Sequence, residues 1–119
     1  MSNPESRLWS GSEPPRLLAS QHLRTGALVF PPVAEDSPLA AEYRPAALDP
    51  VGTVYSYTVI HPAARTGQAP YALGYVDLRG PVRIFGRLQG KARPAIGDRY
   101  RARPDAEYGF TFEHVEDQR

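Results

Sequence analysis

The fold is decided by residues 52–61, which read GTVYSYTVIH. Most of these residues are β-branched or aromatic, and such side chains favour the pleated, half-buried surface of a β-strand. Turn-forming residues follow at once, because residues 62–70 read PAARTGQAP. We therefore predict a strand over residues 52–61 and a loop over residues 62–70.

Four further short strands are predicted downstream, over residues 71–78, 82–88, 98–103 and 108–114. The first two form a hairpin, and a longer link over residues 89–97 joins the strand at 82–88 to the strand at 98–103. Within residues 82–88, Val82 and Ile84 alternate with Arg83 and Phe85, which is the period of a sheet with one packed face. Five short strands at this spacing are typical of a small Greek-key barrel. We predict a mainly β protein with an OB-fold barrel, and an SH3-like barrel is the alternative on pattern alone.

The composition agrees with short elements separated by turns. The 119 residues include 13 prolines and 10 glycines, and this proline content is about twice the average usage. Cysteine is absent, which excludes a disulfide framework, a thiol nucleophile, an iron–sulfur cluster and a thiolate zinc site. We see no secretory leader and no apolar stretch of the ~18 residues that a membrane span needs. A cytoplasmic protein without membrane association is expected.

The N-terminal part is predicted to differ from the barrel. Residues 16–24 read RLLASQHLR, follow Pro14 and Pro15, and precede Gly26. Proline in a first turn and a glycine cap are helix signals, so we predict a helix here. Residues 38–44 are expected to form one helical turn. The predicted organisation is a flexible segment over 1–11, an N-terminal segment over 12–50 and the barrel over 51–116, with mobile residues at 117–119.

A basic cluster is the first candidate for function. Between Arg79 and Arg103 the chain carries seven arginines and Lys91, with Asp98 as the one acid, although the whole chain has a net charge of +1. Arginine suits phosphate groups. Beside exposed aromatics such as Phe85, these arginines fit single-stranded nucleic acid, the phosphates of coenzyme A or a partner protein. A plain solvated face is the remaining interpretation.

The chain offers little for catalysis on its own. His22, His61 and His114 are far apart in sequence and lack metal-ligand spacing. No glycine-rich phosphate loop, nucleophile elbow or paired acid motif is present. We therefore expect a protein that is not itself an enzyme and that has no catalytic residues.

Three stretches carry a family resemblance: VGTVYSYTVIHPA from residue 51, PYALGYVDLRGPVRIFGRLQG from residue 70 and IGDRYRARPDAEYGFTFEHV from residue 96. Together they resemble the acyl-CoA-associated OB-fold family known as domain of unknown function thirty-five. In that family a helix leads into a rubredoxin-like zinc ribbon that precedes the barrel. Here HLRTGALVFPPVAEDSPLA keeps the ribbon's glycine and prolines. By this resemblance the ligand positions fall on His22, Thr25, Ser37 and Ala40.

One histidine cannot make a tetrahedral site, so the resemblance implies a ribbon remnant without metal, and zinc is not expected. The segment must then be held by packing, for which Leu28, Val29 and Phe30 are candidates. The resemblance further implies an accessory subunit in a hetero-oligomer. The expected partner is a thiolase-like, sterol-carrier-type or enoyl-CoA hydratase-like protein.

By the same resemblance the subunit docks on its catalytic partner and helps to shape or cover the acyl-CoA site. No cofactor is expected on this chain alone, and a coenzyme A thioester belongs to the complex. The arginines expected at coenzyme A phosphates or at the partner are Arg65, Arg83, Arg87, Arg99 and Arg101. Further candidates for partner contact are Tyr57, His61 and Phe85. A single-stranded nucleic-acid-binding OB-fold protein is the alternative.

Overall fold

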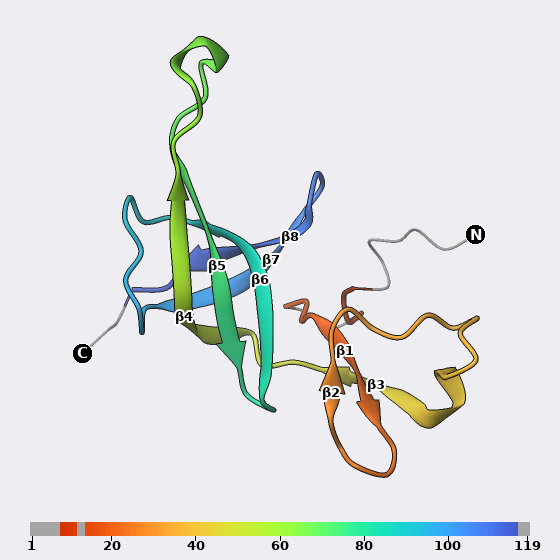
Figure 1. Cartoon of the computed structure of the whole chain (residues 1–119). Helices are drawn as coiled ribbons and strands as arrows, with labels where there is room; N and C mark the ends of the chain where they lie inside the picture. The colour runs from red at the N-terminus through yellow and green to blue at the C-terminus, as the bar shows by residue number, and fades with distance from the viewer. Residues whose placement is uncertain (1–7, 12–13, 117–119) are drawn as a thin grey trace.

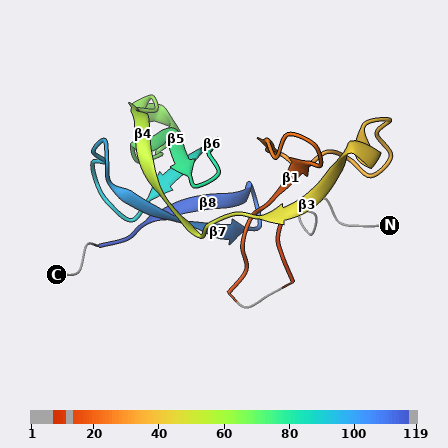
Figure 2. The ribbon, with the colours of Figure 1, turned by 90° about the horizontal axis from the view of Figure 1, so that it is seen from below.

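A computed structural model of the chain describes residues 8–11 and 14–116. It shows a mainly β protein in which a closed barrel and a small three-stranded sheet lie side by side (Figure 1). The view from below separates the same two units (Figure 2). The flexible segment predicted over 1–11 falls largely on residues outside the described ones, as do residues 117–119.

The barrel is built from five strands: β4 (Val51–Ile60), β5 (Tyr71–Leu78), β6 (Val82–Gln89), β7 (Arg99–Asp105) and β8 (Gly109–His114). Their order around the barrel is β4-β5-β6-β8-β7, with β7 closing back onto β4. Neighbouring strands are antiparallel except for β6 and β8, which pair in parallel. All five predicted strands and the Greek-key barrel are thereby confirmed.

The core follows the period of two. Along β5 and β6, every second residue points inward, as Val76 and Ile84 do. Their neighbours in sequence, Tyr75 on β5 and Phe85 on β6, are exposed. On β7, Tyr100 and Ala102 are buried, and Phe112 of β8 completes the interior. This alternation leaves the outer face of β4, β5 and β6 free to carry functional side chains.

The helix predicted over residues 16–24 is wrong. Residues Leu18–His22 form strand β1, which lies between β2 (Leu28–Val29) and β3 (Tyr43–Ala47). The whole of β1 pairs with β3, and the extended backbone directs Leu17 and Ala19 into the core. Leu23, which a helix would place on its apolar stripe, is 61% exposed. The pairing of the whole strand with β3 and the burial of Leu17 and Ala19 outweigh the weak local preference for helix.

Short 3₁₀ turns are the helical elements among the described residues. One, η2 (Ala40–Glu42), lies within the predicted helical turn, and the other, η3 (Ala64–Thr66), lies in the loop that projects beyond β4 and β5 (Figure 1). In residues 8–11 and 14–116, no helix has the length and apolar character to cross a membrane.

Aromatic contacts join the sheet to the barrel. Leu28 and Phe30 pack against the core, which confirms two of the three predicted packing residues, whereas Val29 is 38% exposed. The Phe30 ring meets the Phe110 ring edge-on, with 5.6 Å between centroids. The Trp9 indole Nε1 donates a hydrogen bond to the carbonyl oxygen of Gly109 at 3.0 Å.

Candidate functional site

Four exposed rings gather on one side of the barrel: Tyr55, Tyr75, Phe85 and Tyr108. We call them the aromatic face. A β-bulge in β4 contributes the first, because Val54 pairs with Val76 and Ser56 with Tyr75, leaving Tyr55 as the extra residue. Tyr75 lies opposite Phe85, and the two rings meet edge-on with 5.0 Å between centroids.

Arg83 lies at one end of this face, with its charge already compensated. Its guanidinium stacks over Tyr55, 3.4 Å from the ring centroid. Its Nε and Nη2 donate to the two carboxylate oxygens of Asp77 at 2.6 and 3.1 Å. The hydrogen bond that Arg83 donates to Asp77 raises the pKa of Arg83. This geometry makes Arg83 a rigid, neutralised edge of the face.

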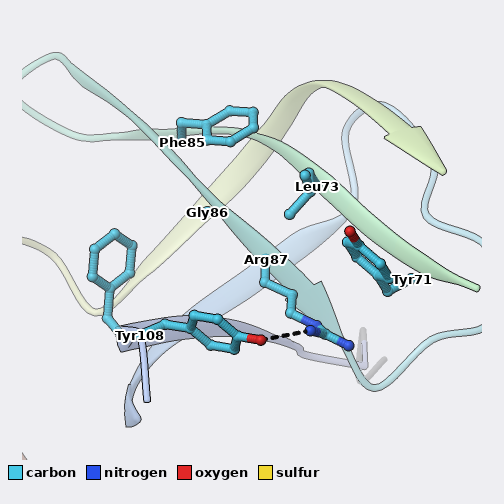
Figure 3. A pocket seen from close by; sticks show the side chains of 7 residues that line it. Tyr71, Leu73, Phe85, Gly86, Arg87 and Tyr108 are labelled. Atoms are coloured by element: carbon cyan, nitrogen blue, oxygen red, sulfur yellow. Dashed lines mark hydrogen bonds between the residues drawn. The ribbon is translucent and has the colours of Figure 1, made fainter. Parts of the chain in front are cut away.

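A pocket of about 400 Å³ opens at the other end. It is lined by Tyr71, Leu73, Phe85, Gly86, Arg87, Tyr108 and Phe110 (Figure 3). The Arg87 guanidinium lies 4.5 Å from the Tyr71 ring centroid and 5.7 Å from that of Tyr108, and its Nη1 donates to the Tyr108 hydroxyl at 3.2 Å. The pocket is thus an apolar hollow with one arginine held between two tyrosines.

The pocket wall is fixed from behind. Phe110 packs against Phe112 of the core as well as against Phe30, and the Trp9 hydrogen bond restrains the backbone beside Tyr108. Gly86 forms part of the floor. A Cβ at this position would lie 2.9 to 3.0 Å from the Phe110 and Phe112 rings, so a larger residue would force these rings to shift.

The predicted arginines do not form one continuous track. Arg83 and Arg87 share the outer face of β6, whereas Arg99 and Arg101 lie on β7 beside the start of β4. Strand β8 separates β6 from β7 on one side, and β5 and β4 separate them on the other. Arg65 lies in η3 on the projecting loop. The structure brings together two of the five.

The three predicted partner-contact residues lie in different surroundings. Phe85 is 49% exposed and lines the pocket. Tyr57 is half-buried and packs against the core, and His61 is exposed just beyond the end of β4. Sequence reasoning missed Tyr55, Tyr108 and Phe110. A bulge and a parallel strand pair bring them to this face, and neither has a local sequence signal.

The four positions that the resemblance assigned to metal ligands lie along the three-stranded sheet: His22 ends β1, Thr25 lies in the turn after it, Ser37 lies between β2 and β3, and Ala40 begins η2. The His22 Nδ1 accepts hydrogen bonds from the backbone N–H groups of Arg24 and Thr25, both at 3.2 Å. The Ser37 hydroxyl accepts one from the N–H of Leu39 at 3.1 Å, and the backbone N–H of Ala40 donates to the Ser37 carbonyl. No group of three or more metal-ligating side chains occurs among the residues described.

A polar cluster lies where the loop after β6 leads into β7. Asp98 accepts hydrogen bonds from Lys91 at 2.7 Å and from the Ala95 N–H at 2.9 Å, and the Lys91 bond is the main cause that lowers the pKa of Asp98. Burial raises the pKa of Tyr100 beside it to about 12. The Tyr100 hydroxyl is buried and has no hydrogen-bond partner among the described residues.

Comparison with known proteins identifies the family of this barrel. Residues 46–104 match the family model described as ChsH2, C-terminal OB-fold domain. The barrel belongs to the DUF35 OB-fold family. A solved structure named Ltp2-ChsH2(DUF35) aldolase resembles the chain with a TM-score of 0.63 and 23% identity, over 83% of this chain and 84% of that chain. At 23% identity, this structural likeness shows that the two chains share a fold and nothing more. A search of curated proteins found no match.

Proposed function

We propose that this chain is a non-catalytic accessory subunit of a thiolase-like or aldolase-type acyl-CoA enzyme. The observation that carries the proposal is the match of residues 46–104 to the C-terminal OB-fold domain of ChsH2. The name of the similar structure pairs ChsH2 with Ltp2 in an aldolase. A hetero-oligomer of the same kind, in which the barrel docks on the catalytic partner, is the arrangement that we propose here.

The aromatic face supports a docking role. Tyrosine and arginine are the residue types that dominate the energetics of protein interfaces, in contrast to the charged rims around them. Tyr55, Tyr75 and Phe85 each expose between 43% and 52% of their surface. Water on these rings would be displaced when a partner covers them, and that displacement favours association.

Coenzyme A thioester would be bound by the complex as a whole. We propose Arg83 and Arg87 for contact with the partner, or with coenzyme A phosphates at its edge, together with Arg65 on the projecting loop. Arg99 and Arg101 lie away from this face, so they serve such a role if the partner extends around β7. Tyr57 and His61 flank the same end of β4 as the loop.

The test is co-expression with a thiolase-like protein encoded beside this chain in its genome. Stoichiometric co-elution of the two proteins in size-exclusion chromatography, with a change in the partner's acyl-CoA turnover on addition of this chain, is the expected result. A chain that elutes alone and leaves the partner's turnover unchanged would exclude the accessory role.

We also propose that the three-stranded sheet is a metal-free remnant of a zinc ribbon. The turns at His22 and Ser37 support this proposal, because their side chains accept the backbone N–H groups that thiolates accept in zinc-binding turns. Replacing His22, Thr25, Ser37 and Ala40 with cysteine should then create a tetrahedral thiolate site. One zinc per chain by elemental analysis is expected. A quadruple variant that folds and binds no zinc would refute the remnant.

A further inference from the structure

The pocket beside Arg87 has a chemistry that identifies what would fill it. We propose that it anchors the docking surface by receiving a large apolar side chain of the partner subunit, with a neighbouring partner carboxylate paired to Arg87. The inference rests on the proposed function and adds to it the site of contact and the chemistry of the contacting segment. That segment carries aspartate or glutamate next to a leucine, phenylalanine or similar residue.

Charge supplies the first argument. Arg83 and Arg87 lie on the same face of the same strand, but Asp77 neutralises Arg83 through two hydrogen bonds. Arg87 instead contacts the rings of Tyr71 and Tyr108 and the Tyr108 hydroxyl. Among the described residues no carboxylate forms an ion pair with Arg87. Its planar fork is shaped for a carboxylate, so a single anionic group complements the pocket.

Arg87 is also fixed in position before any partner arrives. The two tyrosines flank its guanidinium from opposite sides (Figure 3). An arginine side chain that is already ordered loses little conformational freedom on binding, and this increases the affinity that its ion pair can supply. The Tyr108 side of this clamp depends on the turn that Trp9 restrains through Gly109.

The apolar lining supplies the second argument. Leu73, Phe85 and Phe110 leave a hollow of about 400 Å³ around the arginine. That volume accommodates a large side chain with part of its neighbour, and small apolar hollows ringed by aromatic residues are where interface anchors bind. Phe85 and Tyr108 at the rim are about half exposed, so an inserted side chain would cover both.

The distribution of charge favours a protein over a nucleic acid. Proteins that bind single strands follow the phosphate backbone with a groove of several cations. Here Arg83 is neutralised, and Arg99 and Arg101 lie on β7, which is not adjacent to β6. One uncompensated cation inside an apolar hollow matches a single carboxylate rather than a row of phosphates.

The experiment measures the affinity of the full chain for its thiolase-like partner by isothermal titration calorimetry. Arg87→Gln and Phe85→Ala should each weaken binding about 10-fold or more. Arg87→Lys, which keeps the charge, should bind more tightly than Arg87→Gln. One matched control is Arg103→Gln, because Arg103 of β7 pairs with Glu113 of β8 at 3.1 Å. The other is Ile96→Ala, which changes a 72% exposed residue of the β6–β7 loop. Both controls should stay within about 2-fold.

The outcomes separate this inference from the proposed function. If the unmodified chain does not bind the partner, both are refuted. If it binds, and the pocket variants match the controls while unfolding at the wild-type temperature, docking occurs elsewhere and the inference alone is overturned. Binding of a 15-nucleotide oligothymidine at 0.15 M salt, lost in Phe85→Ala, would assign the pocket to nucleic acid and likewise overturn it.

Discussion

Replacing Tyr100 with phenylalanine should make the protein more stable. The Tyr100 side chain is fully buried, and its hydroxyl has no hydrogen-bond partner among the described residues. A buried polar group without a partner costs about 1–3 kcal/mol of folding free energy. The variant loses one oxygen atom and leaves a small void, which takes back part of this gain. We expect a net increase in unfolding free energy of about 1 kcal/mol at pH 7.

The same substitution should remove a loss of stability at high pH. Burial raises the pKa of Tyr100 from 10.0 to about 12, so the folded chain keeps a proton that the unfolded chain releases. The unfolding free energy is unaffected by this difference in pKa below pH 10, and it falls as the pH rises from 10 toward 12. Linkage gives a loss of about 1.4 kcal/mol by pH 11 and about 2.7 kcal/mol in the limit.

Urea unfolding at pH 7, 9 and 11, followed by circular dichroism, measures both effects. The wild-type protein should lose stability relative to Tyr100→Phe between pH 9 and 11. Tyr75→Phe is the matched control, because Tyr75 is 43% exposed and its change at pH 7 should stay within about 0.5 kcal/mol. If Tyr100→Phe is less stable at pH 7, or follows the wild-type curve at pH 11, the reasoning from burial is refuted.

Three further substitutions test packing and charge. Gly86→Ala should lower the unfolding free energy by about 1–3 kcal/mol in urea, because its methyl group would overlap the Phe110 and Phe112 rings; an unchanged midpoint would contradict the tight floor. Phe30→Ala should cost about 2 kcal/mol in thermal unfolding by removing the contact with Phe110, and an equal loss in Val29→Ala would contradict that contact. The hydrogen bond from Lys91 lowers the pKa of Asp98, so ionised Asp98 stabilises the folded chain above pH 3.8, and this stabilisation is lost as the pH falls further. Wild type should thus lose more stability than Asp98→Asn between pH 7 and 3, and parallel losses would count against this ion pair.

The barrel could be predicted because its strands carry an alternation of apolar and polar residues that is visible within each strand. In β6 the alternation of Val82 and Ile84 with Arg83 and Phe85 gives both the strand and the two faces. The N-terminal helix was predicted wrongly because β1 becomes a strand through its partner. That partner, β3, contains Pro45 and shows little alternation of apolar and polar residues, so its sequence does not predict a strand.

The site shows the same division between local and remote information. Alternation with a period of two places Phe85 and Arg87 on one outer face, and residues 82–87 of β6 are enough to predict this. Tyr108 and Phe110 join them because the parallel pairing of β6 with β8 brings residues about twenty positions apart to one surface. Such a register is set by barrel closure, so the pocket could not be predicted from either strand alone.

The position of the three-stranded sheet gives it a role that needs no metal. Phe30, which follows β2, contacts Phe110, and Trp9, which precedes β1, binds the carbonyl of Gly109. These contacts reach Phe110 itself and Gly109, which lies between the two residues, Tyr108 and Phe110, that form this wall of the pocket. The contacts of Trp9 and Phe30 therefore act on the pocket wall directly. A three-stranded sheet without metal can therefore support the proposed docking pocket through Trp9 and Phe30, and these are the residues through which the N-terminal segment would influence partner binding.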